Sequence, residues 1–252
     1  MARARRSRTD QRQLGQFITP SALAGGIVAS LELDVNTRIL EPSFGDGSFI
    51  LPLVERLMGL YEGTDQQRLE LVLSRNIFGV ELDAGMHSRC LDRIEDRWGG
   101  IPASHNLVRG DFFRHDFGRS FDFIVGNPPF GGTFDAEIED ILDRRYGIWN
   151  GYKIKKETYA FFIVRSLEML RHGGSMQFIC SDSFLTIPTM RGLRRLLMEH
   201  GTVVIERLVK FSPETSYPMV VLQFVKDGKS DLAIIEEAPM KRHLMELTGN
   251  FS

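Results

Sequence analysis

The sequence has little cysteine and no long apolar run. Its 252 residues include only two cysteines, Cys90 and Cys180, which lie far apart in apolar surroundings. Two cysteines cannot form a zinc site alone, so we interpret them as reduced core residues and expect no bound metal. No apolar run reaches the ~18 residues of a membrane span, and the N-terminus lacks the apolar segment of a signal peptide. These absences predict a cytoplasmic protein without a membrane partner.

A strong positive charge is also absent. The formal net charge is −2, so the chain as a whole is not a basic nucleic-acid binder. Its positive charges are nevertheless uneven. Arginines crowd residues 1–14, which form either a solvated tail or an arm that neutralises phosphates. A second basic stretch, with Lys153, Lys155 and Lys156, is better placed to contact a polyanion.

Helices and strands are expected to alternate over most of the chain. Apolar residues make up 42% of the sequence and charged residues 25%, as in a globular protein with a sizeable core. We expect Thr19 to cap the first helix, with Pro20 at its first position. Gly173 and Gly174 are expected to end an amphipathic helix. The expected helices are 20–33, 48–60, 66–74, 84–98, 157–171 and 189–200, and the expected strands are 38–41, 77–81, 106–108, 121–125 and 175–180.

The pattern changes after residue 200. Apolar strands are expected at 203–211 and 219–225 with no helix between them, and such a short link makes an antiparallel pair. One more strand is expected at 232–235. The chain therefore predicts an α/β fold, in which a mostly parallel sheet carries helices on both faces and ends in an antiparallel hairpin.

A glycine-rich turn follows the first expected strand, over residues 41–49. Gly45 and Gly47 allow positive φ angles and a close approach of the backbone to a ligand. The helix after the turn presents free N–H groups at its N-terminus. Taken alone, the pattern is equally typical of a plain tight turn between a strand and a helix.

Acidic residues follow the second and third expected strands. Glu81 could accept both hydroxyls of a ribose, with Leu82 packed on an adenine face, although a solvated strand end is also common. Its distance from Gly47 exceeds the ~20 residues usual in dinucleotide-binding folds, so residues 62–76 are expected to lengthen the crossover. Asp111 could accept from an adenine amine beside the ring of Phe112, or could simply form an Asx turn.

The most informative motif follows the fourth expected strand. There the apolar run 121–126 ends in Asn127, Pro128, Pro129 and Phe130. The prolines remove backbone donors and hold the nearby carbonyl groups rigid, the asparagine adds an acceptor, and the phenylalanine adds a flat face. Together these groups could hold a planar ring that bears an exocyclic amine. All four motifs fall at the carboxyl ends of parallel strands, where open α/β sheets bind ligands.

In these motifs the chain resembles the gamma class of N6-adenine DNA methyltransferases. Residues 15–20 (Gly-Gln-Phe-Ile-Thr-Pro) are similar to the N-terminal element of that class, and residues 127–130 are similar to its catalytic motif. The catalytic motif is shared with RNA and protein-glutamine methyltransferases, whereas the N-terminal element points to DNA. The other similar segments are 41–49, 80–83, 110–112 and 157–162.

The resemblance implies a Rossmann-like class I fold with a seven-stranded sheet and S-adenosylmethionine as the cofactor. It implies catalytic roles for residues 127–130, and stacking of Phe130 and Phe211 on a flipped adenine, with Tyr217 as the rival of Phe211. It also implies flipping of the base, because an adenine amine inside a duplex cannot reach the methyl donor. The residues implied for cofactor binding are Thr19, Glu41, Pro42, Gly45, Gly47, Glu81, Leu82, Asp111, Phe112 and Asn127.

The expected partner is double-stranded DNA, in a restriction-modification or related system. We expect a basic tail at 1–14, a catalytic domain at 15–228, and a last strand followed by a polar C-terminal segment at 229–252. Because the class usually carries a target-recognition domain after the hairpin, recognition is expected from a missing domain or a separate specificity subunit. Two alternatives remain open: a methyltransferase of ribosomal RNA or of a protein glutamine amide, and a degenerate binding module that binds no cofactor.

Overall fold

The structure is a computed structural model that describes residues 18–130, 136–208, 218–230, 233–237 and 241–245. These residues form two compact units. The N-terminal unit comprises residues 18–127 and 169–178, and the C-terminal unit comprises the described residues of 128–168 and 179–245. The boundary therefore falls within the motif at 127–130, between Asn127 and Pro128.

The sheet of the N-terminal unit has the strand order β3-β2-β1-β4-β7, and every neighbouring pair is parallel. Every residue of β1 and β2 is buried, which is why these strands read as apolar runs in the sequence. The alternation of strands and helices predicted from the sequence is confirmed here. The strands are β1 (Ile39–Glu41), β2 (Ile77–Glu81), β3 (Asn106–Arg109), β4 (Phe121–Gly126) and β7 (Leu170–Ser181).

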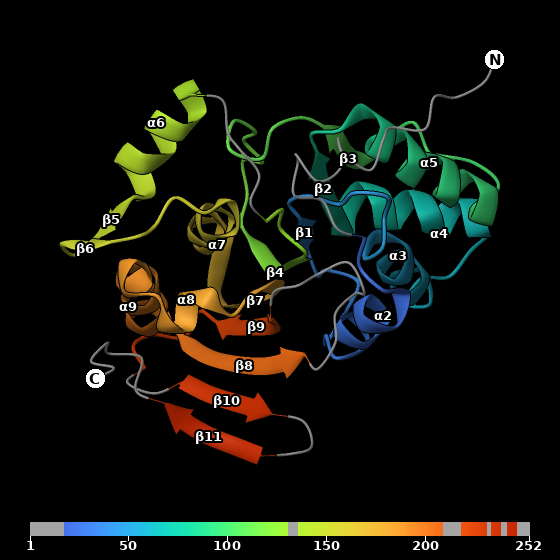
Figure 1. Ribbon diagram of the computed structural model, residues 1–252. Coiled ribbons are helices and arrows are strands. Elements are labelled where there is room, and N and C mark those ends of the chain that lie inside the picture. Colours follow the sequence, from blue (N-terminus) through green and yellow to red (C-terminus); the bar gives the residue numbers. More distant parts are fainter. Residues whose placement is uncertain (1–17, 131–135, 209–217, 231–232, 238–240, 246–252) are drawn as a thin grey trace. The chain divides into compact units, whose positions relative to one another are not determined.

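In the N-terminal unit, α2 precedes β1, and the other helices lie in the connections from β1 to β2 and from β2 to β3. Figure 1 shows them beside one another, with α2 against α3, α3 against α4, and α4 against α5. Because both crossovers from β1 to β3 step along the sheet in the same direction, right-handed connections place α3 and α5 on one face. The helices are α2 (Ser21–Ala29), α3 (Ile50–Met58), α4 (Asp65–Leu71), the π-helical turn η1 (Val72–Asn76) and α5 (Ala84–Trp98).

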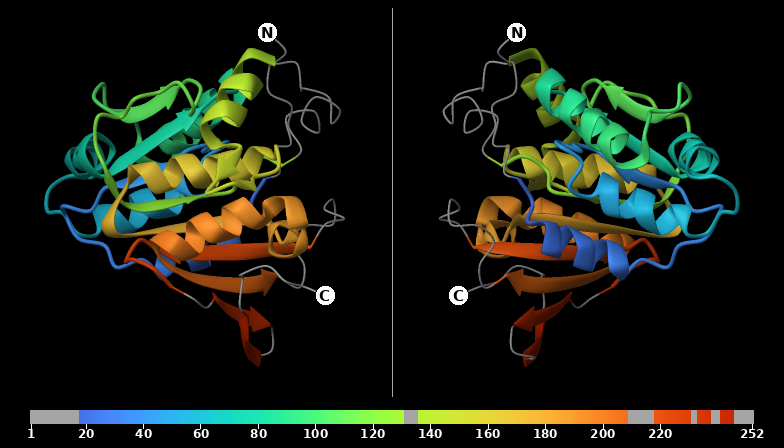
Figure 2. Two further views of the ribbon diagram at one scale, coloured as in Figure 1. Left: turned by 90° about the vertical axis from the view of Figure 1, so that its left-hand side faces the viewer. Right: turned by 90° about the vertical axis from the view of Figure 1, so that its right-hand side faces the viewer.

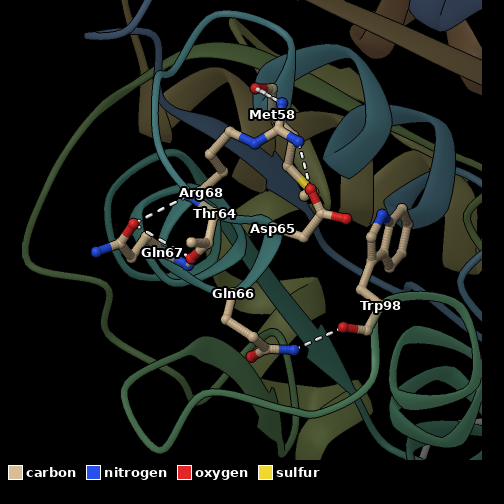
Figure 3. Close-up of polar contacts among 7 residues, drawn as sticks. All are labelled: Met58, Thr64, Asp65, Gln66, Gln67, Arg68 and Trp98. Carbon is tan, nitrogen blue, oxygen red and sulfur yellow. Dashed lines mark hydrogen bonds and ion pairs between the residues drawn. The ribbon is translucent and has the colours of Figure 1, made fainter.

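The long crossover expected between β1 and β2 is filled by α4 and η1. Thr64 begins α4 with a capping box, in which its hydroxyl accepts from the Gln67 amide and its own amide donates to the Gln67 side chain at 2.9 Å (Figure 3). Gln66 donates to the Trp98 carbonyl at 2.6 Å, which ties α4 to the end of α5. The insertion is thus an ordered part of this unit.

The expected role of Thr19 as a helix cap is wrong. Pro20 occupies the N-cap position of α2, and no side-chain hydrogen bond caps this helix. The Pro20 carbonyl instead accepts from the amides of Leu23 and Ala24. The Thr19 hydroxyl accepts from Asn127, a residue 108 positions away, so a local reading of the sequence could not find its partner.

The helix expected at 157–171 differs in length and in character. Helix α7 (Thr158–Met169) ends earlier than expected, and β7 begins at once with Leu170. Gly173, at a φ angle of 73°, therefore lies within the strand, where the pairing of β7 with β4 shifts register. The helix is also not amphipathic, because every residue from Thr158 to Leu167 is buried.

The C-terminal unit contains the antiparallel pair expected after residue 200. Strand β8 (Thr202–Leu208) pairs antiparallel with β9 (Met219–Val225), as predicted. The predicted last strand is β10 (Ala233–Glu237), which pairs parallel with β8. Strand β11 (Lys241–Met245), antiparallel to β10, was not expected. All seven strands that were predicted before residue 226 are therefore present. The predicted last strand β10 and the unexpected β11 extend this set, and the α/β class is confirmed.

A segment between the motif at 127–130 and α7 was missed by the sequence reading. It contains α6 (Ala136–Tyr146) and a small hairpin of β5 (Ile148–Trp149) and β6 (Tyr152–Lys153). The hairpin packs on α9 (Arg191–His200), which also lies along β8 (Figures 1 and 2). Trp149 donates to Glu199 at 2.7 Å, and the guanidinium groups of Arg191 and Arg195 lie 4.4 Å from the centre of the Tyr152 ring. The turns between β7 and α9 are α8 (Ser183–Thr186) and the 3-10 turn η2 (Pro188–Met190).

The second basic stretch has acidic neighbours. Lys156 lies 3.3 Å from Glu139 and 3.5 Å from Asp143, and Lys155 forms an ion pair with Glu157. These pairs are exposed and offset part of the local positive charge. Contact of this stretch with a polyanion stays a prediction. Cys90 and Cys180 are buried free thiols, as expected. Within the described ranges, every helix is too short or too polar to cross a membrane.

Candidate functional site

The candidate site lies at the carboxyl ends of the parallel strands in the N-terminal unit. Strands β1, β2 and β4 end at Glu41, Glu81 and Gly126, and Gly110 follows β3. Because the strands are parallel and adjacent, the segments that follow them leave the same edge of the sheet. A Cβ added to Gly126 would lie 3.6 Å from Pro42 and 3.7 Å from the Cγ of Glu41. The motif at 127–130 therefore starts beside the glycine-rich turn.

Both glycines of that turn have the positive φ angles expected from the sequence. Gly45 has a φ of 56° and Gly47 a φ of 88°. A Cβ on Gly47 would lie 2.6 Å from the Sγ of Cys90 and 2.7 Å from the Cδ1 of Leu51. A Cβ on Gly45 would meet only Met86, at 4.0 Å. Gly47 thus allows close packing of the turn on α3 and α5, whereas Gly45 faces open space.

Glu81 holds the glycine-rich turn and is not a solvated strand end. Its side chain is only 2% exposed. One carboxylate oxygen accepts from the Gly45 amide at 2.8 Å, and the other accepts from the Asp83 amide at 2.8 Å. Asp83 in turn caps α5 by accepting from the amides of Gly85 and Met86. Leu82, between the two acids, is 63% exposed and presents an apolar surface at this edge.

Glu41 is a buried acid at the end of β1. Only 2% of its surface is exposed, and in the described part of the chain its Oε2 has no hydrogen-bond partner. Burial raises the pKa of this carboxyl well above the ordinary value of 4.5, and the negative charges of Glu81 and Asp46 raise it further. Burial thus favours the neutral form of this carboxyl, and an approaching cation would favour the charged form.

Replacing Glu41 with glutamine is expected to change how stability depends on pH. Above the ordinary pKa of 4.5 the unfolded chain loses its proton while the folded protein keeps it, so the free energy of unfolding falls as pH rises towards the folded-state pKa. The glutamine variant lacks this loss. Without ligand, its Tm should therefore rise relative to that of the parent as the pH is raised above about 5.

The control for this comparison is a substitution at the exposed Glu70. Glu70→Gln makes the same chemical change at an exposed side chain, so it controls for effects of the substitution that do not depend on burial. Parallel Tm profiles for Glu41→Gln and the parent would show that Glu41 is not held neutral by the fold.

Asp111 forms the Asx turn that was the alternative reading of this motif. Its Oδ1 accepts from the Phe113 amide at 2.9 Å, and its Oδ2 lies 3.8 Å from Arg114. Phe112 is 3% exposed and its ring lies 5.4 Å from that of Phe113. The turn positions Asp111 at the edge of the sheet, and contact of Asp111 and Phe112 with an adenine ring stays a prediction.

Asn127 is oriented by Thr19. Its Nδ2 donates to the Oγ1 of Thr19 at 3.1 Å, and Thr19 is 6% exposed. Taken by itself, the C-terminal unit begins with a buried Pro128, followed by Pro129 and Phe130, which are half-buried. Phe211, Tyr217 and residues 15–17 of the N-terminal element lie outside the described residues.

The sequence reading missed two contributors to this site. Arg93 of α5 donates to the Asp46 carbonyl at 2.8 Å and lies 3.1 Å from the Asp46 carboxylate, so it pins the glycine-rich turn to α5. Asp83 was not expected as a cap, although an aspartate directly before a helix is a signal that could have revealed it. Within the described part of the chain, no cluster of three or more metal-binding side chains occurs.

Comparison with solved structures places the fold in a known class. The M protein of the type I restriction enzyme EcoKI matches with a TM-score of 0.68 at 18% identity, over 88% of this chain and 48% of that chain. A Listeria monocytogenes protein assigned to the class I S-adenosylmethionine-dependent methyltransferases matches with a TM-score of 0.67 at 15% identity. The match covers 89% of this chain and 67% of that chain. The predicted Rossmann-like class I methyltransferase fold is therefore confirmed.

Comparison of sequences identifies the family. The Type II methyltransferase M.TthHB8I of Thermus thermophilus is 29% identical over 227 residues, which are 86% of this chain and 46% of the relative. The chain spans less than half the length of the curated relatives with the strongest matches. The model of the Eco57I restriction-modification methylase family matches residues 89–216, just over half of the chain. The protein therefore belongs to the Eco57I restriction-modification methylase family.

Proposed function

We propose that this chain is the catalytic part of a DNA methyltransferase that transfers a methyl group from S-adenosylmethionine to the N6 amine of adenine. The observation that carries the proposal is the position of Asn127, at the end of β4 and next to the glycine-rich turn and its buried acids. Membership of a restriction-modification methylase family supports DNA as the acceptor.

The residues of the N-terminal unit fit S-adenosylmethionine. The cofactor carries a sulfonium cation and an ammonium group, and the buried Glu41 carboxyl has an oxygen without a hydrogen-bond partner among the described residues. An acid in such surroundings is stabilised by a nearby cation. The exposed Leu82 offers an apolar face beside Glu81. When bound, the cofactor supplies an electrophilic methyl group.

In this proposal each motif holds one part of the cofactor. Glu81 holds the ribose hydroxyls, with Leu82 beside the adenine. Asp111 and Phe112 hold the adenine ring. The glycine-rich turn and two neighbouring side chains hold the methionine part. The residues of this group are Thr19, Glu41, Pro42, Gly45, Gly47 and Asn127.

Asn127 and Pro128 activate the acceptor by hydrogen bonding. The lone pair of an adenine amine is delocalised into the ring, so the amine is a poor nucleophile. The Asn127 side-chain oxygen and the Pro128 carbonyl accept its two N–H groups, which favours a pyramidal nitrogen with an available lone pair. The same two oxygens stabilise the positive charge that develops on the nitrogen, so no strong base is required.

Phe130 stacks on the target base in this proposal. Stacking of an aromatic side chain on a base contributes ~1–3 kcal/mol in single-strand binders. The adenine has to leave the duplex before it reaches these groups, which is the base flipping implied by the chemistry. Because the chain spans less than half the length of its relatives, target recognition belongs to a further segment or a separate subunit in this proposal.

The proposal is tested by methyl transfer from labelled S-adenosylmethionine. The acceptors are duplex DNA and an adenine-containing single strand, with structured RNA and a protein extract as competitors. The single strand is included because its bases are already unstacked, so transfer to it depends less on target recognition. Binding of the cofactor is measured on the same sample by calorimetry.

The expected result is cofactor binding and label in DNA, with the single strand accepting even where the duplex does not. Label only in RNA or protein would overturn the acceptor that we propose. Absence of cofactor binding would overturn the enzyme itself and favour a binding module.

A further inference from the structure

The side chain of Thr19 has an unusual partner for a residue at the start of a helix. Threonine before a helix normally caps it through its hydroxyl. Here α2 begins after Pro20 without a side-chain cap, and Thr19 is 6% exposed. Its Oγ1 accepts from the Nδ2 of Asn127 at 3.1 Å. Both residues belong to the N-terminal unit, so the contact lies within one compact body.

This contact holds the Asn127 amide with its nitrogen towards Thr19. The nitrogen and oxygen of a primary amide have nearly the same shape, and rotation about χ2 exchanges them in a broad, roughly two-fold energy profile. In the observed arrangement the amide nitrogen faces the Thr19 hydroxyl, so the amide oxygen is directed to the other side. The oxygen is the atom that the proposed mechanism needs at the adenine amine.

We propose that Thr19 is a positioning residue for catalysis, which orients the Asn127 amide so that its oxygen receives the amine of the target base. This inference rests on the proposed function. It gives the threonine of the N-terminal element a role towards the catalytic asparagine, beyond the contact with the methionine part of the cofactor that the resemblance implied.

The test compares Thr19→Val with Thr19→Ser. Valine keeps the branched shape but removes the hydroxyl, so the amide loses the hydrogen bond that holds it in the observed orientation. Serine keeps the acceptor oxygen. We expect the valine variant to lower kcat for an adenine-containing single strand about tenfold, the typical value of one hydrogen bond in a preorganised site. The serine variant should stay within about twofold of the parent. Because Thr19 also belongs to the proposed cofactor site, kcat is measured at saturating S-adenosylmethionine and the Kd for the cofactor is measured separately.

A second readout does not depend on activity. The side-chain NH2 resonances of Asn127 are assigned by their loss in Asn127→Asp. Thr19→Val should shift these resonances and speed their exchange with water, whereas Thr19→Ser should leave them nearly in place. Thr37→Val is the control, because Thr37 is also 6% exposed in the same unit and its hydroxyl bonds to Asp34 at 3.0 Å. It should change neither the Asn127 resonances nor kcat.

The outcomes separate this inference from the proposed function. Shifted Asn127 resonances together with a lower kcat in the valine variant alone support it. Unshifted Asn127 resonances in the valine variant overturn this inference, whichever acceptor the protein proves to methylate. Shifted resonances with an unchanged kcat also overturn it, because the hydrogen bond would then exist without positioning the amide. A weaker Kd for the cofactor with an unchanged kcat would assign Thr19 to cofactor binding instead.

Discussion

Replacing Asn127 with alanine is expected to lower the rate of methyl transfer to adenine by about 10²–10³-fold. The loss follows from removal of one preorganised acceptor at the atom where positive charge develops. Because the amide oxygen acts on the acceptor amine, the Kd for S-adenosylmethionine should change far less than the rate does. Single-turnover rates on an adenine-containing strand, with calorimetry of cofactor binding, measure both quantities.

Asn76→Ala is a useful contrast to this variant. Asn76 is fully buried, donates to the carbonyls of Thr37 and Val35 at 2.8 and 3.1 Å, and accepts from Tyr61 at 2.8 Å. Its removal leaves buried polar groups unsatisfied and should lower the free energy of unfolding by about 1–3 kcal/mol. Well below its Tm, that variant should retain its rate. Near-normal turnover in Asn127→Ala would remove Asn127 from the mechanism.

Replacing Gly47 with alanine is expected to lower the free energy of unfolding by about 2–5 kcal/mol. One part of the cost is the positive φ of 88°, and the other is the overlap of a new Cβ with Cys90 at 2.6 Å and Leu51 at 2.7 Å. The turn cannot relax freely, since Glu81 binds its Gly45 amide and Arg93 binds its Asp46 carbonyl. Chemical denaturation measures the loss in the free energy of unfolding. Titration of the same variant with S-adenosylmethionine measures cofactor binding.

Two further glycines provide graded controls for Gly47. A Cβ on Gly45 would meet no close neighbour, so only the positive φ angle disfavours alanine there. Gly45→Ala should therefore lower the free energy of unfolding by about 1–2 kcal/mol. A Cβ on Gly25, inside α2, meets nothing within 4 Å, so Gly25→Ala should raise the stability by about 0.5–1 kcal/mol. A Gly47→Ala variant as stable as Gly45→Ala would show that close packing does not require this glycine.

The sheet of the N-terminal unit was predictable because buried parallel strands read as short apolar runs. Strands such as Ile77–Glu81 fall where the sequence placed them. The prediction of alternating strands and helices failed where an element departs from its usual pattern. Helix α7 is buried on all sides, so no polar face marked its end, and Gly173 lies in a register shift of β7. The two-residue strands β5 and β6 carry too little pattern to be predicted.

The candidate site was predictable as a set of strand ends, but its contacts were not. Parallel strands bring their carboxyl ends together, so Glu41, Glu81 and Asn127 could be grouped from order alone. The bond from the Gly45 amide to Glu81 and the bond from Asn127 to Thr19 join residues 36 and 108 positions apart. Such contacts depend on how the loops pack, and no local pattern encodes them.

Identification of the methylated nucleoside tests the proposed methyl transfer to adenine most directly. DNA treated with the protein and S-adenosylmethionine bearing a deuterated methyl group is digested to nucleosides and analysed by mass spectrometry, with Asn127→Ala as the control. We expect label in N6-methyladenine alone and its loss in the control. Label in a methylated cytosine, or equal label in adenine from the control, would contradict the proposal.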